Sequence, residues 1–415
     1  MRELGIDHAV NLCSAAIDYP ERAEQGGAMA AHGMVFDVAV IGAGPAGSAA
    51  ALAARRGGAR VLLLDRARFP RDKPCGDGIA ADAIEVLDRL GVRDAVDGYP
   101  PVGRLRLVAP GGEAVSRALP RPAHTVPRRV FDARLVDAAV RAGAELHRHT
   151  VRRLHDDGDR VCIDDAYAAR VVIGADGAGS VVRRCTGAAA NPPGHVAIAL
   201  RGYAPARHTD EQVIVTTRAQ WPAYAWSFPI GDGTANVGYG EVLRGAPLSR
   251  AYLLDRLGAL LPGVQPDGLR GHHLPLSTRR PPPGRGRLLL AGDALSLINP
   301  FTGEGIFYAV LSGALAGAAA GRGARRVAPR YARALRARLG RHLRHSALAA
   351  RLTRHPAVVD AAVRAAARDQ AVFDRMVDLG LGDGVFGPRM IGRIAAAFAA
   401  PSRSGSFPEP NRSGS

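Results

Sequence analysis

Residues 35–47 read VFDVAVIGAGPAG, and this stretch decides the fold. Its first seven residues are apolar apart from Asp37, which is typical of a buried parallel strand. An alanine-rich helix is expected over 46–56, and a second apolar strand over 60–65. Strand, helix and strand in this order form a βαβ unit, so the sequence predicts an α/β protein.

Three glycines between the first strand and the helix have the spacing GxGxxG. Gly42 allows a tight turn, Gly44 lets the backbone approach a pyrophosphate, and Gly47 lets helix and strand pack closely. Asp65 ends the second strand, 23 residues after Gly42, where its carboxylate can accept a hydrogen bond from an adenosine ribose. The combination predicts a dinucleotide site, with the phosphates at the amides around Ala46 that begin the helix.

Two further motifs follow apolar strands. Residues 174–177 read GADG and place Asp176 and Gly177 at the end of one strand. Residues 288–294 read LLLAGDA, so Asp293 follows another strand, where it can bind a polyol hydroxyl. The carboxyl ends of parallel strands meet at one edge of a sheet, so these residues are expected near the glycine turn.

A fourth motif opens a helix. Residues 299–305 read NPFTGEG, and Gly303, Gly305 and Ile306 lie where the helix is expected to begin. Glycines at this position expose backbone amides at the positive end of a helix dipole, which stabilises negative charge on a bound group.

Composition excludes several classes of protein. The chain has 415 residues and a formal net charge of +17, but Lys73 is its only lysine, which indicates a base-composition bias as much as a basic function. No nucleic-acid-binding motif is present and only 5% of residues are aromatic, so no nucleic-acid partner is expected. The arginines then lie on solvated faces, or on a surface that meets anionic lipid.

Cysteine usage and hydropathy together indicate where the protein is located. The four cysteines have neither disulfide-framework nor zinc spacing, so no metal site is expected; they are Cys13, Cys75, Cys162 and Cys185. The sequence has no run of 18 apolar residues, so no membrane-spanning helix is predicted. No secretory signal is recognisable either. A cytoplasmic location is therefore expected.

The glycine turn, the 174–177 motif and the 288–294 motif together resemble FAD-binding proteins of the para-hydroxybenzoate hydroxylase type, over residues 35–320. The resemblance implies that the turn and Asp65 bind the AMP half of FAD and that Asp293 binds the ribityl chain. An arginine before a Phe-Asp pair contacts the cofactor in that family, which corresponds to Arg128 here rather than to its neighbour Arg129. Val151 corresponds to the strand that meets the adenine.

Two more segments narrow the resemblance to one group of these FAD-binding proteins. Residues 69–78 read FPRDKPCGDG, and residues 221–229 read WPAYAWSFP. They resemble the KPCGxG loop and PxxYxWxFP strand of geranylgeranyl reductases, although only Ala223 separates Pro222 from Tyr224 here. Residues 299–305 also resemble that family. The likeness is nearest to the actinobacterial branch that reduces the isoprenoid chains of lipoquinones.

The resemblance assigns roles to named residues. Those implied to contact the cofactor are Gly42, Gly44, Ala46, Gly47, Asp65, Arg66, Cys75, Gly76, Gly78, Arg128, Val151, Asp176, Gly177, Asp293, Gly303, Gly305 and Ile306. Tyr224, Trp226 and Phe228 share one face of a strand and would line an apolar slot for a prenyl tail, or else form a packed core. Cys75 is the catalytic candidate, a thiol that positions substrate or gives up a proton, with a small buried filler as the alternative.

The expected architecture is a Rossmann-type FAD-binding domain with an inserted antiparallel-sheet substrate domain and C-terminal helices. The FAD domain is assigned to 34–99, 126–187 and 281–320, and the substrate domain to 100–125 and 188–280. Helices are expected over 321–400, with disordered ends at 1–33 and 401–415.

The expected activity is hydride transfer from reduced FAD to a C=C bond of a polyprenyl group, in a hydrophobic small-molecule substrate. The sequence shows no second glycine fingerprint, so NAD(P)H docking transiently or a reduced ferredoxin would supply electrons. A monooxygenase (hydroxylase or epoxidase), a halogenase and a non-catalytic flavin protein remain alternatives. A monomer is expected, with peripheral membrane contact through an arginine- and leucine-rich helix within 324–354.

Overall fold

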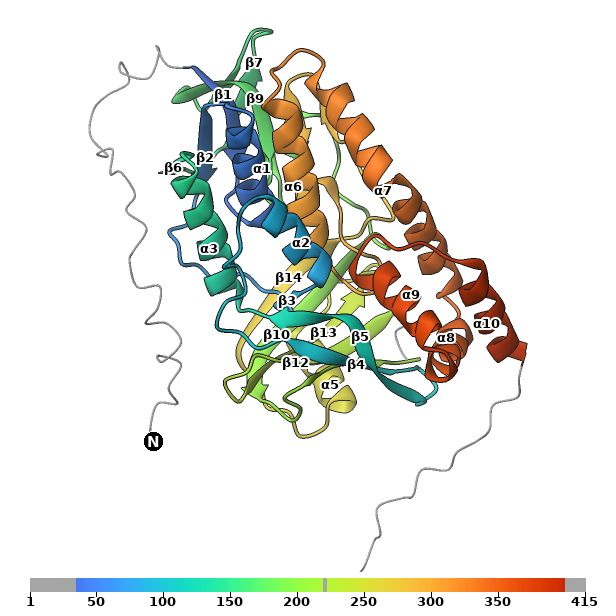
Figure 1. Ribbon diagram of the computed structural model, residues 1–415. Helices are drawn as coiled ribbons and strands as arrows, with labels where there is room; N and C mark the ends of the chain where they lie inside the picture. The colour runs from blue at the N-terminus through green and yellow to red at the C-terminus, as the bar shows by residue number, and fades with distance from the viewer. Residues whose placement is uncertain (1–34, 219–221, 400–415) are drawn as a thin grey trace, which may run out of the picture.

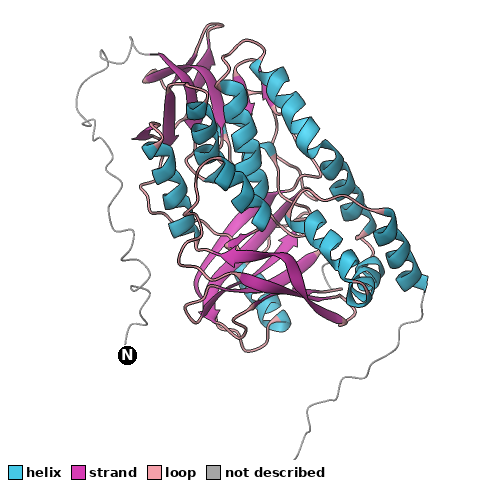
Figure 2. Ribbon diagram, viewed as in Figure 1, coloured by secondary structure: helices cyan, strands magenta, loops and turns pink. Residues whose placement is uncertain are grey.

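The computed structural model describes residues 35–218 and 222–399, so the ends expected to be disordered, 1–33 and 401–415, lie outside the described residues. Two sheets lie at opposite ends of the molecule (Figure 1). Helices pack on the first sheet and continue along one side toward the second (Figure 2). None of the helices in the described ranges combines the length and hydropathy needed to cross a bilayer.

The first sheet contains the predicted βαβ unit. Its strand order is β15-β16-β9-β1-β2-β6, and β1, β2, β6, β9 and β16 run parallel. The strands are β1 (Val35–Ile41), β2 (Val61–Asp65), β6 (Glu145–Arg148), β9 (Tyr167–Gly174), β15 (Gly284–Arg285) and β16 (Leu288–Leu290), with a side hairpin of β7 (Leu154–Asp156) and β8 (Val161–Ile163). The carboxyl ends of β1, β2, β9 and β16 thus meet at one edge, as the sequence predicted.

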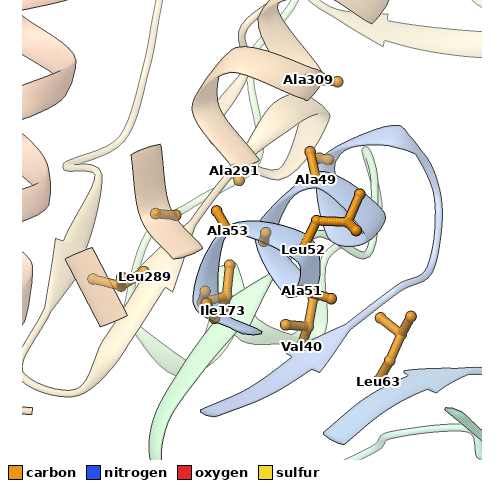
Figure 3. Packing of buried hydrophobic residues seen from close by; sticks show 14 of the residues in the cluster. Val40, Ala49, Ala51, Leu52, Ala53, Leu63, Ile173, Leu289, Ala291 and Ala309 are labelled. Atoms are coloured by element: carbon orange, nitrogen blue, oxygen red, sulfur yellow. The ribbon is translucent and has the colours of Figure 1, made fainter. Parts of the chain in front are cut away.

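Helix α1 (Pro45–Arg56) lies against α6 (Ile306–Ala320) because both have small residues at the contact. A Cβ atom on Gly313 would lie 2.0 Å from the Ala46 carbonyl oxygen, and one on Gly317 would lie 2.1 Å from the Ala50 carbonyl oxygen. Figure 3 shows side chains of the surrounding core, including Val40 on β1 and Ala53 on α1. This contact fixes the start of α6 against the start of α1. Helix α3 (Arg128–Arg141) also packs on α1.

The second sheet has the order β14-β10-β13-β12-β11-β4-β5-β3. It is antiparallel except between β4 and β11, which run parallel, a pairing that the sequence reasoning did not foresee. Its strands are β3 (Gly78–Ile79), β4 (Val102–Val108), β5 (Ala114–Thr125), β10 (Val196–Pro205), β11 (Glu211–Thr216), β12 (Ala223–Pro229), β13 (Thr234–Val242) and β14 (Asp267–Pro275). Strand β3 comes from the stretch 34–99, so the loop before it reaches from the first sheet to the second.

The remaining helices cover the second sheet and one flank. Helix α5 (Arg250–Leu260) packs on β10, β12 and β13, and α8 (Pro356–Arg368) and α9 (Gln370–Leu381) pack on β5. Figure 1 shows α7 (Val327–Leu352) running along the side of the molecule. The other helical elements are α2 (Ala81–Arg89), α4 (Val181–Cys185), η2 (Gly292–Leu295) and α10 (Pro388–Ala399).

The leucine face of α7 differs from the expectation of a membrane-facing helix. Leu335, Leu339 and Leu343 are buried against the core of the first sheet, and only Leu348 and Leu352 at the end of the helix are exposed. The periodic leucines therefore serve mainly to pack the helix onto the protein, because burying them there removes their apolar surface from water.

Candidate active site

A cavity of about 790 Å³ is lined by residues of both sheets. Every residue assigned to the site from the sequence lines it except Gly47. These residues come from far apart in the chain, from the ends of β1, β2, β9 and β16, the loop before β3, the face of β12 and the start of α6. The cavity is large enough for a cofactor together with part of a substrate chain.

The glycine turn explains why Gly47 is the exception. A Cβ atom on Gly47 would lie 1.7 Å from the Gly42 carbonyl oxygen, so this glycine allows the helix to pack on the turn. Gly42 has a φ of 97° and would clash with Ala175 if it carried a Cβ atom. Gly44 is open toward the cavity, with only the Arg71 guanidinium 3.4 Å from the position of its Cβ atom. Gly44 thus leaves the space that a pyrophosphate requires.

Asp65 holds the same turn in place. Its Oδ2 accepts a hydrogen bond from the Ala43 amide and its Oδ1 accepts one from the Ala67 amide, each at 2.8 Å. A carboxylate has about four acceptor positions, so the side chain can still accept from a ribose hydroxyl. Arg66 and Val151 line the cavity beside it.

Arg128, and not Arg129, reaches the cavity. Arg128 is buried, and its Nε and Nη2 donate to Asp132 Oδ1 and Oδ2 at 2.6 and 2.9 Å, whereas Arg129 is exposed. Asp132 also pairs with Arg71, at 3.2 Å. The bidentate pair fixes the plane of the Arg128 guanidinium toward the cavity.

Lys73 is a site residue that the sequence reasoning missed. Its Nζ lies 3.0 Å from Asp293 Oδ2, although the two are far apart in the chain. Burial alone would raise the pKa of Asp293, but the charges of Lys73 and His272 hold it below its ordinary value. Burial and the charge of Lys73 lower the pKa of His272 to about 4, so this imidazole is neutral at neutral pH. The chain's only lysine, beside a recognised motif, was the signal that could have identified it.

The Cys75 loop lies against an aromatic wall on β12. Cβ atoms on Gly76 and Gly78 would lie 3.4 Å from Trp226 Nε1 and 3.5 Å from the Phe228 ring, so the loop backbone is in close contact with this wall. The Tyr224 and Trp226 rings are 5.9 Å apart between centroids. Tyr224, Trp226 and Phe228 all line the cavity, as the alternation along the strand predicted.

A buried polar network beside the wall also went unpredicted. Asn236 on β13 accepts from Trp226 Nε1 at 2.8 Å and donates to the Cys75 carbonyl at 2.8 Å and to Asp77 Oδ2 at 2.7 Å. Tyr203 donates to the same Asp77 oxygen at 2.7 Å. Burial raises the pKa of Asp77 to about 6, against the lowering effect of these hydrogen bonds. The network fixes the loop to the second sheet, and only the tertiary fold reveals it.

These residues fit FAD. The glycine turn leaves a gap that a Cβ atom would fill at Gly44, and Arg128 supplies a cation and Asp293 an acceptor along the same cavity. Gly303, Gly305 and Ile306 also line the cavity, so the backbone amides at the start of α6 lie beside it. Among the described residues, no group of three His, Cys, Asp or Glu side chains has the arrangement of a metal site.

Residues 35–209 match the family model described as FAD binding domain. The menaquinone reductase of Mycolicibacterium smegmatis is 33% identical over 307 residues, which cover 67% of this chain and 75% of that protein. Digeranylgeranylglycerophospholipid reductase 1 of Methanopyrus kandleri is 34% identical over 306 residues, covering 68% of this chain and 79% of that protein. The chain belongs to the geranylgeranyl reductase family. It is an FAD-dependent oxidoreductase, as its sequence predicted.

Solved structures agree in fold. A geranylgeranyl bacteriochlorophyll reductase-like protein from Thermoplasma acidophilum has a TM-score of 0.68 at 22% identity and covers 88% of this chain and 96% of that one. A flavin-dependent brominase has a TM-score of 0.62 at 18% identity and covers 80% of this chain and 93% of that one. The brominase shares the architecture, so the fold alone does not separate a reductase from an oxygen-using enzyme.

Proposed function

We propose that this reductase reduces isolated C=C bonds of a polyprenyl chain, with FAD held along the first sheet and the prenyl tail against the second. The observation that carries the proposal is the single cavity that joins the glycine turn to the aromatic wall of Tyr224, Trp226 and Phe228. The names of the curated relatives, menaquinone reductase and digeranylgeranylglycerophospholipid reductase, support the same class of substrate.

The protein's part in this reaction is to bind and orient. When bound and reduced, FAD would supply a hydride, which carries the electron pair. An isolated alkene has no carbonyl that a side chain could polarise, so the rate depends on placement in a dry pocket. Leu274 and Ile298 line the cavity near the aromatic wall and extend its apolar surface. The aromatic rings hold a flat, unsaturated chain in a fixed orientation.

Cys75 is assigned a positioning role. Burial raises the pKa of the Cys75 thiol, although the nearby Arg128 charge lowers it, so the group is a neutral thiol at neutral pH. A neutral thiol is a compact and polarizable contact for an apolar chain. The loop packing through Gly76 and Gly78 holds it at the junction of the two parts of the cavity.

We assign the supply of electrons to NAD(P)H docking transiently or to a reduced ferredoxin, since the chain has no second glycine fingerprint for a nicotinamide cofactor. We also propose a peripheral contact with anionic membrane, from which a prenyl lipid would enter. The support for this contact is the net charge of +17 and the exposed Leu348 and Leu352.

The experiment that tests the function is anaerobic incubation of the dithionite-reduced protein with geranylgeranyl lipids and with menaquinones, followed by mass spectrometry of the lipids. The proposal predicts products that gain two hydrogens per event without oxygen. A monooxygenase or a halogenase would leave the lipids unchanged under argon and would modify a substrate only after oxygen is admitted.

A further inference from the structure

Reduction of an alkene needs a proton as well as a hydride, and Glu304 occupies the position for delivering it. Glu304 lies two residues before the start of α6 and is one of the residues that line the cavity, as are Tyr224, Trp226 and Phe228. Its Oε1 accepts a hydrogen bond from the Phe307 amide at 2.7 Å, which anchors the carboxyl at one end.

The loop that carries Glu304 touches the aromatic wall directly. The Tyr224 hydroxyl donates to the Thr302 carbonyl, and a Cβ atom on Gly303 would lie 2.5 Å from that hydroxyl oxygen. The Tyr224 proton is thereby engaged with the backbone. Glu304 follows directly in the chain, so this loop places it in the same cavity as the wall proposed to hold the prenyl tail.

The other carboxyl groups that line the cavity are committed elsewhere. Asp293 pairs with Lys73, and Asp72 pairs with Arg201 and Arg270. Asp65 accepts from two turn amides, and Asp176 accepts from the Ser180 hydroxyl and the Val181 amide, both beside the glycine turn. Asp293 and Asp72 are thus paired with cations, and Asp65 and Asp176 are hydrogen-bonded beside the glycine turn.

We propose that Glu304 is the general acid that protonates the alkene, an inference that rests on the proposed function. In this step the C=C π bond breaks, one carbon takes the hydride with its electron pair from the reduced cofactor, and the other takes the proton of the Glu304 carboxyl. The alkene gains two C–H bonds, the cofactor is oxidised, and Glu304 is left as a carboxylate that water reprotonates.

The protonation state of Glu304 suits this role. Burial raises the pKa of Glu304 to about 7, against the lowering effect of the Phe307 and Ile306 amides. A general acid acts best when its pKa lies near the working pH. The acid form is present below that pKa and is lost as pH rises through it. His272, with a pKa lowered to about 4 by burial and the Lys73 charge, is not in its acidic imidazolium form at neutral pH.

The test compares the FAD-loaded protein with its Glu304→Gln variant, in which the amide oxygen can still accept from Phe307. Single-turnover reduction of a polyprenyl lipid under argon should slow by ~10²-fold or more, because general acids typically contribute ~10²–10⁴-fold. The wild-type rate should fall as pH rises through about 7, and the variant should lack this limb. Glu304→Asp, which keeps an acid, should restore part of the rate. Glu85→Gln, at an exposed position of α2, is the matched control and should change neither rate nor profile.

A second readout needs no turnover. The infrared difference spectrum between the resting protein and Glu304→Gln should contain a carboxylic-acid C=O band that disappears with a midpoint near pH 7. Absence of that band, or an active wild-type protein whose Gln variant keeps its rate and pH limb, would overturn the assignment and leave the proposed function standing. A wild-type protein that reduces no polyprenyl lipid would overturn the function and this assignment with it.

Discussion

We predict that substitution of Gly44 removes cofactor binding without disturbing the fold. Its Cβ position meets only the flexible Arg71 side chain, at 3.4 Å, and faces the cavity. Gly44→Val should therefore fold normally but place two methyl groups in the path of the pyrophosphate. We expect purified Gly44→Val to be colourless, with unchanged circular dichroism, and the parent protein to be yellow.

The matched control is Gly103→Val on β4, where an added Cβ atom meets nothing within 4 Å. This variant should keep the flavin content of the parent protein. Full flavin absorbance in Gly44→Val would show that the cofactor binds elsewhere.

Cys75 should resist alkylation. Burial raises the pKa of its thiol, and the thiolate is the form that reacts with iodoacetamide. At a pH of about 7.5 an ordinary thiol is roughly one tenth ionised. Peptide mass spectrometry at that pH should show the exposed Cys185 modified well before Cys75. Equal or faster modification of Cys75 would indicate a reactive thiolate and contradict its assignment as a neutral contact.

Among single residues, the sequence predicted those whose roles depend on local backbone conformation. Gly42 and Gly47 follow from a turn and a helix start that the spacing of the motif defines. Lys73 and Asn236 contact partners distant in the chain, and Glu304 lies at a cavity that only the folded chain assembles, so the spacing of local motifs did not assign them roles.

The contact between α1 and α6 depends on glycines that no other residue can replace. Gly317→Ala would bring a methyl group to 2.1 Å from the Ala50 carbonyl oxygen and force the helices apart. Overpacking of this kind typically costs ~1–3 kcal/mol, so chemical denaturation should show a lower free energy of unfolding. A variant as stable as the parent would mean that the helices are not in this close contact.

Gly258→Ala is the control for this change, because Gly258 lies in α5 with nothing within 4 Å of its Cβ position. The same substitution there should raise the free energy of unfolding by up to ~1 kcal/mol, since alanine has the higher helix propensity.

Periodicity along the sequence predicted the helices and strands better than it predicted what they pack against or pair with. The leucines of α7 have helical spacing, and they indicated an apolar face correctly, but not whether protein or lipid covers it. Leu339 is fully buried against the first sheet, so protein covers most of that face. The parallel pairing of β4 with β11 was hidden for a similar reason, since it joins strands about 100 residues apart.

At the scale of the whole molecule, we expect salt-sensitive binding to anionic vesicles. The side chains of Leu348 and Leu352 are exposed beside Arg344 and Arg351, and the net charge of +17 favours an anionic surface. The double variant Leu348→Ser/Leu352→Ser should float less with anionic vesicles than the parent protein. Leu254→Ser on α5 is the control and should float as the parent does. Protein that stays at the bottom of the gradient at low salt would remove the membrane contact.

We propose that one cavity brings a reduced flavin and a polyprenyl double bond together. This can be measured by mixing the dithionite-reduced, FAD-loaded protein with a polyprenyl lipid under argon and following the absorbance of oxidised flavin. We expect the flavin to be reoxidised without oxygen, one equivalent for each double bond reduced. Flavin that stays reduced with every polyprenyl lipid until oxygen is admitted would contradict it.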